Sequence, residues 1–264
     1  MDQSVTTAPE QSVLLIGIDL GTSAVKCTVH DAAGTLRGTG RIAYPLETAD
    51  GAALQDANVW WQATLAALTT ALQGSDVTQV IAIGVGGQAP SPVALSPTLE
   101  PLGKVAIWLD RRPGAYAAAL QERLGARQQL IERLGIRMAA HAAWARDARP
   151  EQFAAARWYL HSWDYLVARL TGTVNASMAP WSPAIEAMGL PAELFGDAEA
   201  AVGSIAGTVS ASVAARTGVP VGTPVVAAGV DSFSDVRGQR RLALRRCLRV
   251  RRHLGQYLHR RRSR

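Results

Sequence analysis

Residues 13–29 read VLLIGIDLGTSAVKCTV, and this stretch decides the fold. The apolar, β-branched run from Val13 to Asp19 predicts a buried strand, and Gly21-Thr22-Ser23 after it supplies a tight turn. Apolar and polar side chains then alternate over residues 25–29, which predicts a second strand. The stretch is therefore a predicted antiparallel hairpin with a glycine at its turn.

The turn of this hairpin carries residue types that bind phosphate. Backbone N–H groups beside Gly21 and the hydroxyls of Thr22 and Ser23 can donate to phosphate oxygens. Asp19 is a candidate ligand for Mg²⁺, directly or through water, and Lys26 adds a positive charge nearby. An ordinary structural hairpin has the same pattern, so the context of the turn has to distinguish the two interpretations.

Strands and helices alternate after the hairpin. A turn at 31–34 leads to a third strand, which completes an antiparallel meander, and a helix with the capping residue Asp56 continues to Gly74. The further predicted elements are strands over 80–85, 92–95, 104–108 and 225–230, the third strand of the meander over 36–46, and helices within 113–172. We expect 92–95 and 104–108 to complete the β-rich layer. The pattern indicates an α/β domain, a mixed β-sheet with flanking helices.

Composition excludes several protein classes. Hydrophobic residues make up 48% of the 264-residue chain and charged residues 18%, which predicts a globular protein for most of its length. Asp19 interrupts the first apolar run far short of the about 20 residues that a membrane span needs. Cys27 and Cys247 suggest neither a disulfide framework nor a metal site. We expect a cytoplasmic protein without a signal peptide or a membrane span.

Five further segments, in chain order, carry a family resemblance. They are QDANVWW at 55–61, IAIGVGGQ at 81–88, AIWLDRR at 106–112, DYLVARLTG at 164–172 and GTPVVA at 222–227. With the hairpin before them and Asp231 after them, they resemble the amino-terminal domain of the FGGY family of carbohydrate kinases, in its xylulokinase-like members. The resemblance implies an actin-like ATPase fold, which is ribonuclease H-like, with two domains closing over a cleft.

The resemblance also implies a reaction, the transfer of the γ-phosphoryl group of ATP to a hydroxyl of a sugar or polyol. Asp231, at a strand end, is then the base that accepts the hydroxyl proton. Asp19 positions Mg²⁺ and Thr22 the phosphates. Gln88 and Asp110 are the candidates for contacts with the sugar, because amide and carboxylate groups form hydrogen bonds in fixed directions.

One departure from the family pattern affects the substrate. Xylulokinases usually follow the glycine-glutamine pair with methionine and histidine, whereas this chain has Ala89-Pro90-Ser91-Pro92. The arginine-glutamate pair of glycerol kinases is absent there as well. The sequence therefore leaves the sugar open.

The resemblance covers one domain, at 13–235. We expect residues 1–12 to be a flexible N-terminus and 236–264 to be an unstructured or frameshifted tail, because residues 237–264 hold 12 arginines and no acidic residue. The second, nucleotide-binding domain is then expected to be missing, and the chain to be a truncated kinase with weak or no activity. The full-length form is a candidate homodimer.

Three other interpretations stay open. The tail has an imperfect stripe of leucines among arginines, which suits an anionic membrane surface or nucleic acid, although no base-reading motif points to a specific nucleic acid. The chain is otherwise a non-catalytic sugar-binding fragment, or an actin-like ATPase of another family, which would lack the 108–112 and 164–172 segments. Helical and strand spacing predicts core packing for most of Trp60, Trp61, Trp108, Trp158 and Trp163, and structural roles for His141 and His161.

Overall fold

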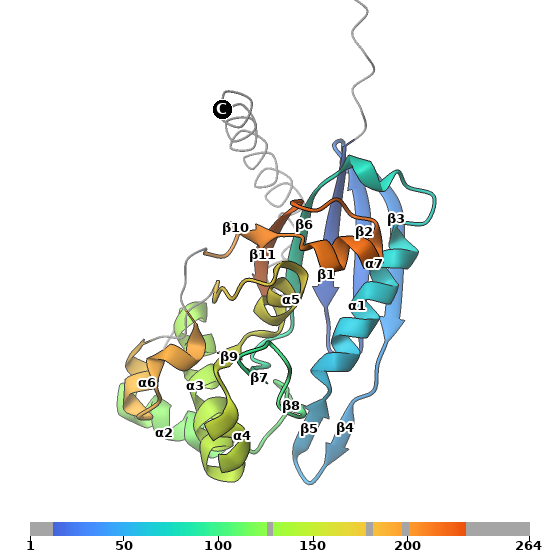
Figure 1. Cartoon of the computed structure of the whole chain (residues 1–264). Helices are drawn as coiled ribbons and strands as arrows, with labels where there is room; N and C mark the ends of the chain where they lie inside the picture. The colour runs from blue at the N-terminus through green and yellow to red at the C-terminus, as the bar shows by residue number, and fades with distance from the viewer. Residues whose placement is uncertain (1–12, 126–128, 178–181, 197–200, 231–264) are drawn as a thin grey trace, which may run out of the picture.

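A six-stranded sheet forms the centre of the molecule (Figure 1). The computed structural model describes residues 13–125, 129–177, 182–196 and 201–230. In spatial order the strands of this sheet are β10 (Ile205–Thr208), β11 (Pro224–Val230), β6 (Val80–Gly87), β1 (Leu14–Leu20), β2 (Ala24–Asp31) and β3 (Leu36–Ala43). β1 is parallel to β6, and β6 to β11, whereas β2, β3 and β10 each pair antiparallel with their neighbours. The sheet is therefore mixed, and the carboxyl ends of β1, β6 and β11 share one edge.

Helices cover this sheet because its strands present apolar residues to them. Helix α1 (Ala57–Ala71) begins at Asp56, whose carboxylate accepts a hydrogen bond from the Asn58 N–H at 2.8 Å, and it packs on β2 and β3. Gly40 allows the close approach, since a Cβ there would lie 2.0 Å from the Ala67 carbonyl oxygen. Helices α5 (Ser162–Thr171) and α7 (Ala211–Thr217) complete the layer around the sheet core.

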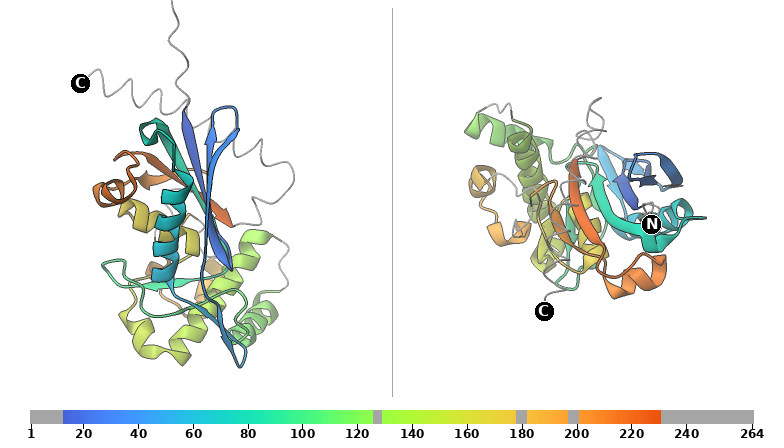
Figure 2. Two further views of the ribbon diagram at one scale, coloured as in Figure 1. Left: turned by 90° about the vertical axis from the view of Figure 1, so that its right-hand side faces the viewer. Right: turned by 90° about the horizontal axis from the view of Figure 1, so that it is seen from above.

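A second group of helices lies beyond the carboxyl ends of β1 and β11, as both side views show (Figures 1 and 2). It contains α2 (Gly114–Leu124), α3 (Leu130–Ala148), α4 (Pro150–Ala155), α6 (Ser182–Ala187) and the short helix η2 (Ala192–Phe195), and it has a separate apolar core around α3. Two small sheets join it to the central sheet: β4 (Glu47–Ala49), β5 (Ala52–Gln55) and β8 (Val105–Ala106) form one, and β7 (Val93–Leu95) and β9 (Trp158–Leu160) the other. The short helix η1 (Val77–Gln79) leads into β6.

The structure confirms the predicted meander, the helix after Asp56 and the strands at 80–85 and 225–230. The prediction that 92–95 and 104–108 complete the main layer is wrong, because β7 pairs with β9 and β8 with β5 in separate sheets. The predicted helical region 113–172 contains strand β9, and residue 161 precedes α5 rather than lying within a helix. β4, β5, β10, α6, α7 and the short helices η1 and η2 were not predicted.

The termini of the predicted domain cannot be compared, since 1–12 and 231–264 lie outside the described residues. Within the described ranges, no helix is long and apolar enough to cross a membrane.

Candidate functional site

The backbone carbonyl groups of the turn between β1 and β2 accept hydrogen bonds from Tyr44 and Gln55. Tyr44 binds two of them, donating its hydroxyl to the Gly21 carbonyl and its N–H to that of Ser23 at 3.2 Å. The Gln55 side-chain Nε2 donates to the Thr22 carbonyl at 2.6 Å. The N–H groups of Thr22 and Ser23 have no hydrogen-bond partner among the described residues. The turn therefore leaves two donors available for an anion, and phosphate binding at this turn stays a prediction.

Asp19 and Lys26 face each other at the base of the turn. They are register partners in the β1–β2 ladder, and the Lys26 Nζ lies 3.9 Å from the Asp19 Oδ2. The Asp19 carboxylate is 45% exposed, and after burial its charge is the second cause that raises the pKa of Cys27 to about 12. No cluster of three or more acidic, histidine or cysteine side chains suited to a metal occurs within the described ranges. One half-exposed carboxylate fits Mg²⁺, which takes most of its ligands from water and phosphate.

Trp108 extends the turn toward the helical group. Its indole Nε1 donates to the Thr22 hydroxyl at 2.9 Å, its backbone N–H donates to the Ser91 hydroxyl, and its carbonyl accepts from Arg137 of α3 at 3.0 Å. The predicted core role holds for Trp60, Trp61 and Trp163, whereas Trp108 is 38% exposed. Trp108 is thus an accessible aromatic surface beside the predicted phosphate turn.

Gln88 lies immediately after β6, next to the end of β1. Its N–H donates to the Leu20 carbonyl at 2.8 Å, and its carbonyl accepts from the Ser162 hydroxyl at 2.7 Å. Its side-chain Nε2 donates to the Gln55 Oε1 at 2.9 Å, and the Gln88 Oε1 has no partner in the described part of the chain. A buried acceptor without a donor is rare and points to a ligand or water.

Asp110 is held in a different way. Its buried carboxylate accepts two hydrogen bonds from the Arg112 side chain, at 2.6 and 3.0 Å, and one from each of the Arg112 and Ala53 N–H groups. Burial opposes ionisation, but these hydrogen bonds outweigh it and hold the pKa of Asp110 below its usual value. All four acceptor positions of the carboxylate are in use, so sugar contact by Asp110 stays a prediction that needs one of these bonds to open.

Asp231 lies outside the described residues. It directly follows Val230, the last residue of β11, which pairs with Gly87, the residue before Gln88. The register therefore brings the strand end before Asp231 beside the strand end that carries Gln88.

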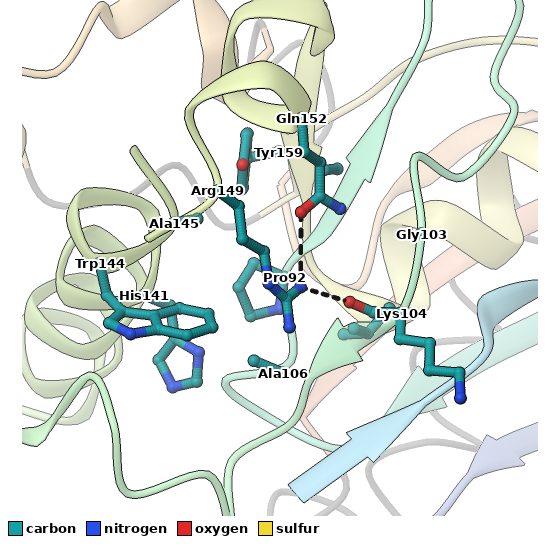
Figure 3. Close-up of a pocket in the computed structure, with 12 residues that line it drawn as sticks. Pro92, Gly103, Lys104, Ala106, His141, Trp144, Ala145, Arg149, Gln152 and Tyr159 are labelled. Atoms are coloured by element: carbon teal, nitrogen blue, oxygen red, sulfur yellow. Dashed lines mark hydrogen bonds between the residues drawn. The ribbon is translucent and has the colours of Figure 1, made fainter. Parts of the chain in front are cut away.

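A partly open cavity of about 20 Å³ lies between the helices α3 and α4 and the strands β7 and β8, and its lining includes none of the predicted site residues (Figure 3). His141, Trp144, Arg149 and Tyr159 contribute to its lining, and the Arg149 guanidinium donates to the Lys104 carbonyl at 2.7 Å. The His141 Nδ1 and the Tyr159 hydroxyl are buried without partners in the described ranges. Burial, reinforced by the charge of Arg137, lowers the pKa of His141 to about 4, so its imidazole is neutral at pH 7.

The sequence did not assign roles to the residues that hold the site together. Gln55, Tyr44 and Ser162 each bind a backbone carbonyl of the turn or of Gln88. Gln55 belongs to the 55–61 segment that carried the resemblance, and this was the available signal. Tyr44 follows the meander with no pattern that marks it.

A family model confirms the resemblance. Residues 14–238 match the amino-terminal domain of the FGGY family of carbohydrate kinases. The chain belongs to this family. Relatives in this family include a xylulose kinase of Streptomyces coelicolor, 31% identical over 165 residues, and one of Haemophilus influenzae, 32% identical over 172 residues. The first match covers 60% of this chain and 34% of the relative, so the chain spans about a third of the length of the curated relatives it matches.

Solved structures show the same fold. The gluconate kinase of Lactobacillus acidophilus superimposes with a TM-score of 0.73 at 20% identity, over 84% of this chain and 49% of that one. The xylulose kinase of Rhodospirillum rubrum gives a TM-score of 0.72 at 23% identity, with the same coverage. The fold of this FGGY domain is therefore the actin-like ATPase fold that the sequence predicted.

Proposed function

We propose that this chain is the sugar-binding domain of a xylulose kinase, an enzyme that transfers the γ-phosphoryl group of ATP to a ketose hydroxyl. The observation that carries the proposal is the meeting of three strand ends: the turn after β1, Gln88 after β6 and, by register, the start of the segment after β11. Ligands of α/β sheets bind at such carboxyl ends. The curated relatives with this domain are xylulose kinases.

Each group of the chain has a role in the proposed reaction. The N–H groups of Thr22 and Ser23 donate to phosphate oxygens. Lys26 adds a positive charge beside this turn, which begins at Gly21. Asp19 holds Mg²⁺, which neutralises phosphate charge when bound. Gln88 accepts a hydrogen bond from the sugar. Asp231 takes the proton of the attacking hydroxyl, in a reaction that depends chiefly on alignment.

The proposal separates sugar binding from transfer. Alignment of ATP and sugar depends on the closure of two domains in the family that this chain resembles, and this chain matches about a third of its curated relatives' length. We therefore propose that the 264-residue chain binds xylulose weakly and turns over little ATP. Fusion to the segment that follows the matched region in the Streptomyces coelicolor relative is expected to give xylulose-dependent transfer.

The experiment measures xylulose binding by calorimetry on the chain and phosphate transfer by the fusion. Asp231→Asn is expected to reduce transfer by about 10³-fold, because the base is lost. Asp147→Asn, an exposed aspartate of α3, serves as the matched control and keeps transfer unchanged. Full transfer by Asp231→Asn rules out its role as the base, and a chain that binds neither xylulose nor other polyols rules out the sugar site.

A further inference from the structure

We propose that a Trp60–Gln55–Gln88 relay fixes the side-chain amide of Gln88 with its oxygen toward the ligand, and that Gln55 is the positioning residue of this relay. The inference rests on the proposed function and specifies it further: Gln88 acts as a hydrogen-bond acceptor, so the sugar presents a hydroxyl donor at this point.

The Gln55 side chain makes hydrogen bonds to several separate segments of the chain. Gln55, at the end of β5, is 2% exposed, and its Nε2 donates to the carbonyls of Thr22 at 2.6 Å and Pro45 at 3.5 Å. Its Oε1 accepts from the Trp60 indole at 3.2 Å and from the Gln88 Nε2 at 2.9 Å. One buried side chain therefore joins the phosphate turn, helix α1 and the end of β6.

The groups at the ends of this network can act only as donors or only as acceptors. The Trp60 indole N–H is only a donor, and the carbonyls of Thr22 and Pro45 are only acceptors. Gln55 must therefore direct its oxygen to Trp60 and its nitrogen to the carbonyls. With the Gln55 oxygen facing Gln88, Gln88 must donate its own nitrogen. Neither amide can be reversed without placing two donors or two acceptors together.

The Gln88 Oε1 is the atom of this network that remains without a partner among the described residues. This oxygen is buried, whereas the Gln88 nitrogen is occupied. An acceptor so placed discriminates against a ligand that offers another acceptor, because a buried site with an unmatched polar group loses affinity. A sugar hydroxyl supplies the missing donor. The relay thus selects a hydroxyl over a carbonyl or carboxylate oxygen at this position.

The test compares two tryptophans. Trp60→Phe removes the donor that orients Gln55, whereas Trp163→Phe removes an equally buried indole whose N–H binds Ser177, outside the relay. We expect Trp60→Phe to weaken xylulose binding by about fivefold to tenfold, the equivalent of one hydrogen bond. Trp163→Phe is expected to stay within about twofold of wild type, although both variants lose stability. Equal losses of affinity in the two variants overturn the proposal.

Two variants of Gln55 test its positioning role directly. Gln55→Glu keeps an oxygen for Trp60 and Gln88, so it is expected to retain xylulose affinity within about twofold at pH 5, where a buried carboxyl is protonated and donates to Thr22. Gln55→Met, of similar length, has neither group and is expected to lose about tenfold. Equal affinities of Glu and Met variants contradict the relay, as does a Gln55→Glu protein with no pH dependence between pH 5 and 9.

A spectroscopic readout separates failure of the relay from failure of the proposed function. In ¹⁵N-labelled protein, the side-chain amide protons of Gln88 are expected to exchange slowly with water in the absence of sugar, and faster in Trp60→Phe than in Trp163→Phe. Rapid exchange in the wild-type protein overturns the relay. Slow exchange in a chain that fails to bind xylulose leaves the relay standing and removes the proposal that xylulose is the substrate.

Discussion

The relay at the strand ends and the cavity of the helical group handle buried polar groups in opposite ways. Around Gln55, each donor and acceptor of the side chain has a partner in another segment, and the single unpartnered atom is the Gln88 oxygen. In the cavity, the His141 Nδ1 and the Tyr159 hydroxyl both lack partners among the described residues. The cavity has room for about one water molecule.

The difference separates geometry that specifies a ligand from geometry that tolerates solvent. A fully connected polar network is rigid, because breaking any bond strands its partner. The relay therefore presents the Gln88 oxygen in one orientation. The cavity wall has no comparable constraint on Tyr159, whose hydroxyl is not held by protein groups in the described ranges. We expect substitution of Gln55 to be costly and removal of the Tyr159 hydroxyl to be nearly neutral.

The largest expected effect comes from Gln55→Leu, which breaks the relay at its centre. The variant strands the buried Trp60 indole N–H and Gln88 nitrogen, and the partly buried Thr22 carbonyl. At about 1 to 2 kcal/mol for each stranded group, the free energy of unfolding falls by about 4 kcal/mol. Urea unfolding measures this loss, and a loss below about 1 kcal/mol means that the network contributes little to stability.

Most of the sheet was predictable, because its strands have local signals. The alternation over 25–29 and the turn at Gly21 define β1 and β2, and the helical period after Asp56 defines α1. The elements that escaped are short or lack a period: β5 and β9 have four and three residues. Their existence depends on partners distant in sequence, as when Val93 of β7 pairs with Leu160 of β9.

The candidate site was predictable in its residues but not in their connections. The resemblance selected Gln88 and Asp110, yet nothing local distinguishes a glutamine with a spare oxygen from an aspartate with four hydrogen bonds. That distinction arises from contacts across long sequence separations, such as Gln55 with Gln88. Trp108 likewise resembles a core residue by spacing, and only the fold shows that it is exposed.

Asp164 of α5 has one hydrogen-bonded and one unpartnered oxygen in the same buried carboxylate, and its ionisation makes stability depend on pH. One carboxylate oxygen accepts from the Ser177 N–H at 3.3 Å, and the other has no partner in the described part of the chain. Burial raises the pKa of Asp164 to about 7, so the folded protein holds a proton that the unfolded chain releases near pH 4. The free energy of unfolding therefore falls as pH rises from about 4 to 7 on account of this group.

Asp164→Asn removes this titration. The pH-dependent part of the difference in free energy of unfolding between variant and wild type is therefore small at pH 4 and grows toward pH 7. The stability of the variant relative to wild type is expected to rise across that range and to level off above it. The buried histidines contribute equally to both proteins, so they cancel in the difference. Urea unfolding at pH 4, 5, 6, 7 and 8 measures the slope, and parallel stability curves show that Asp164 is ionised throughout.

The smallest expected effect comes from Tyr159→Phe in the cavity wall. Removing a hydroxyl that no protein group binds leaves the free energy of unfolding within about 0.5 kcal/mol of wild type, since no partner is stranded. Tyr165→Phe is the matched control, because the Tyr165 hydroxyl is as buried but donates to the Ala57 carbonyl at 3.0 Å. That variant is expected to lose about 1 kcal/mol. If both substitutions lower the free energy of unfolding equally, the Tyr159 hydroxyl is bound as firmly as that of Tyr165. The contrast between the cavity and the relay is then wrong.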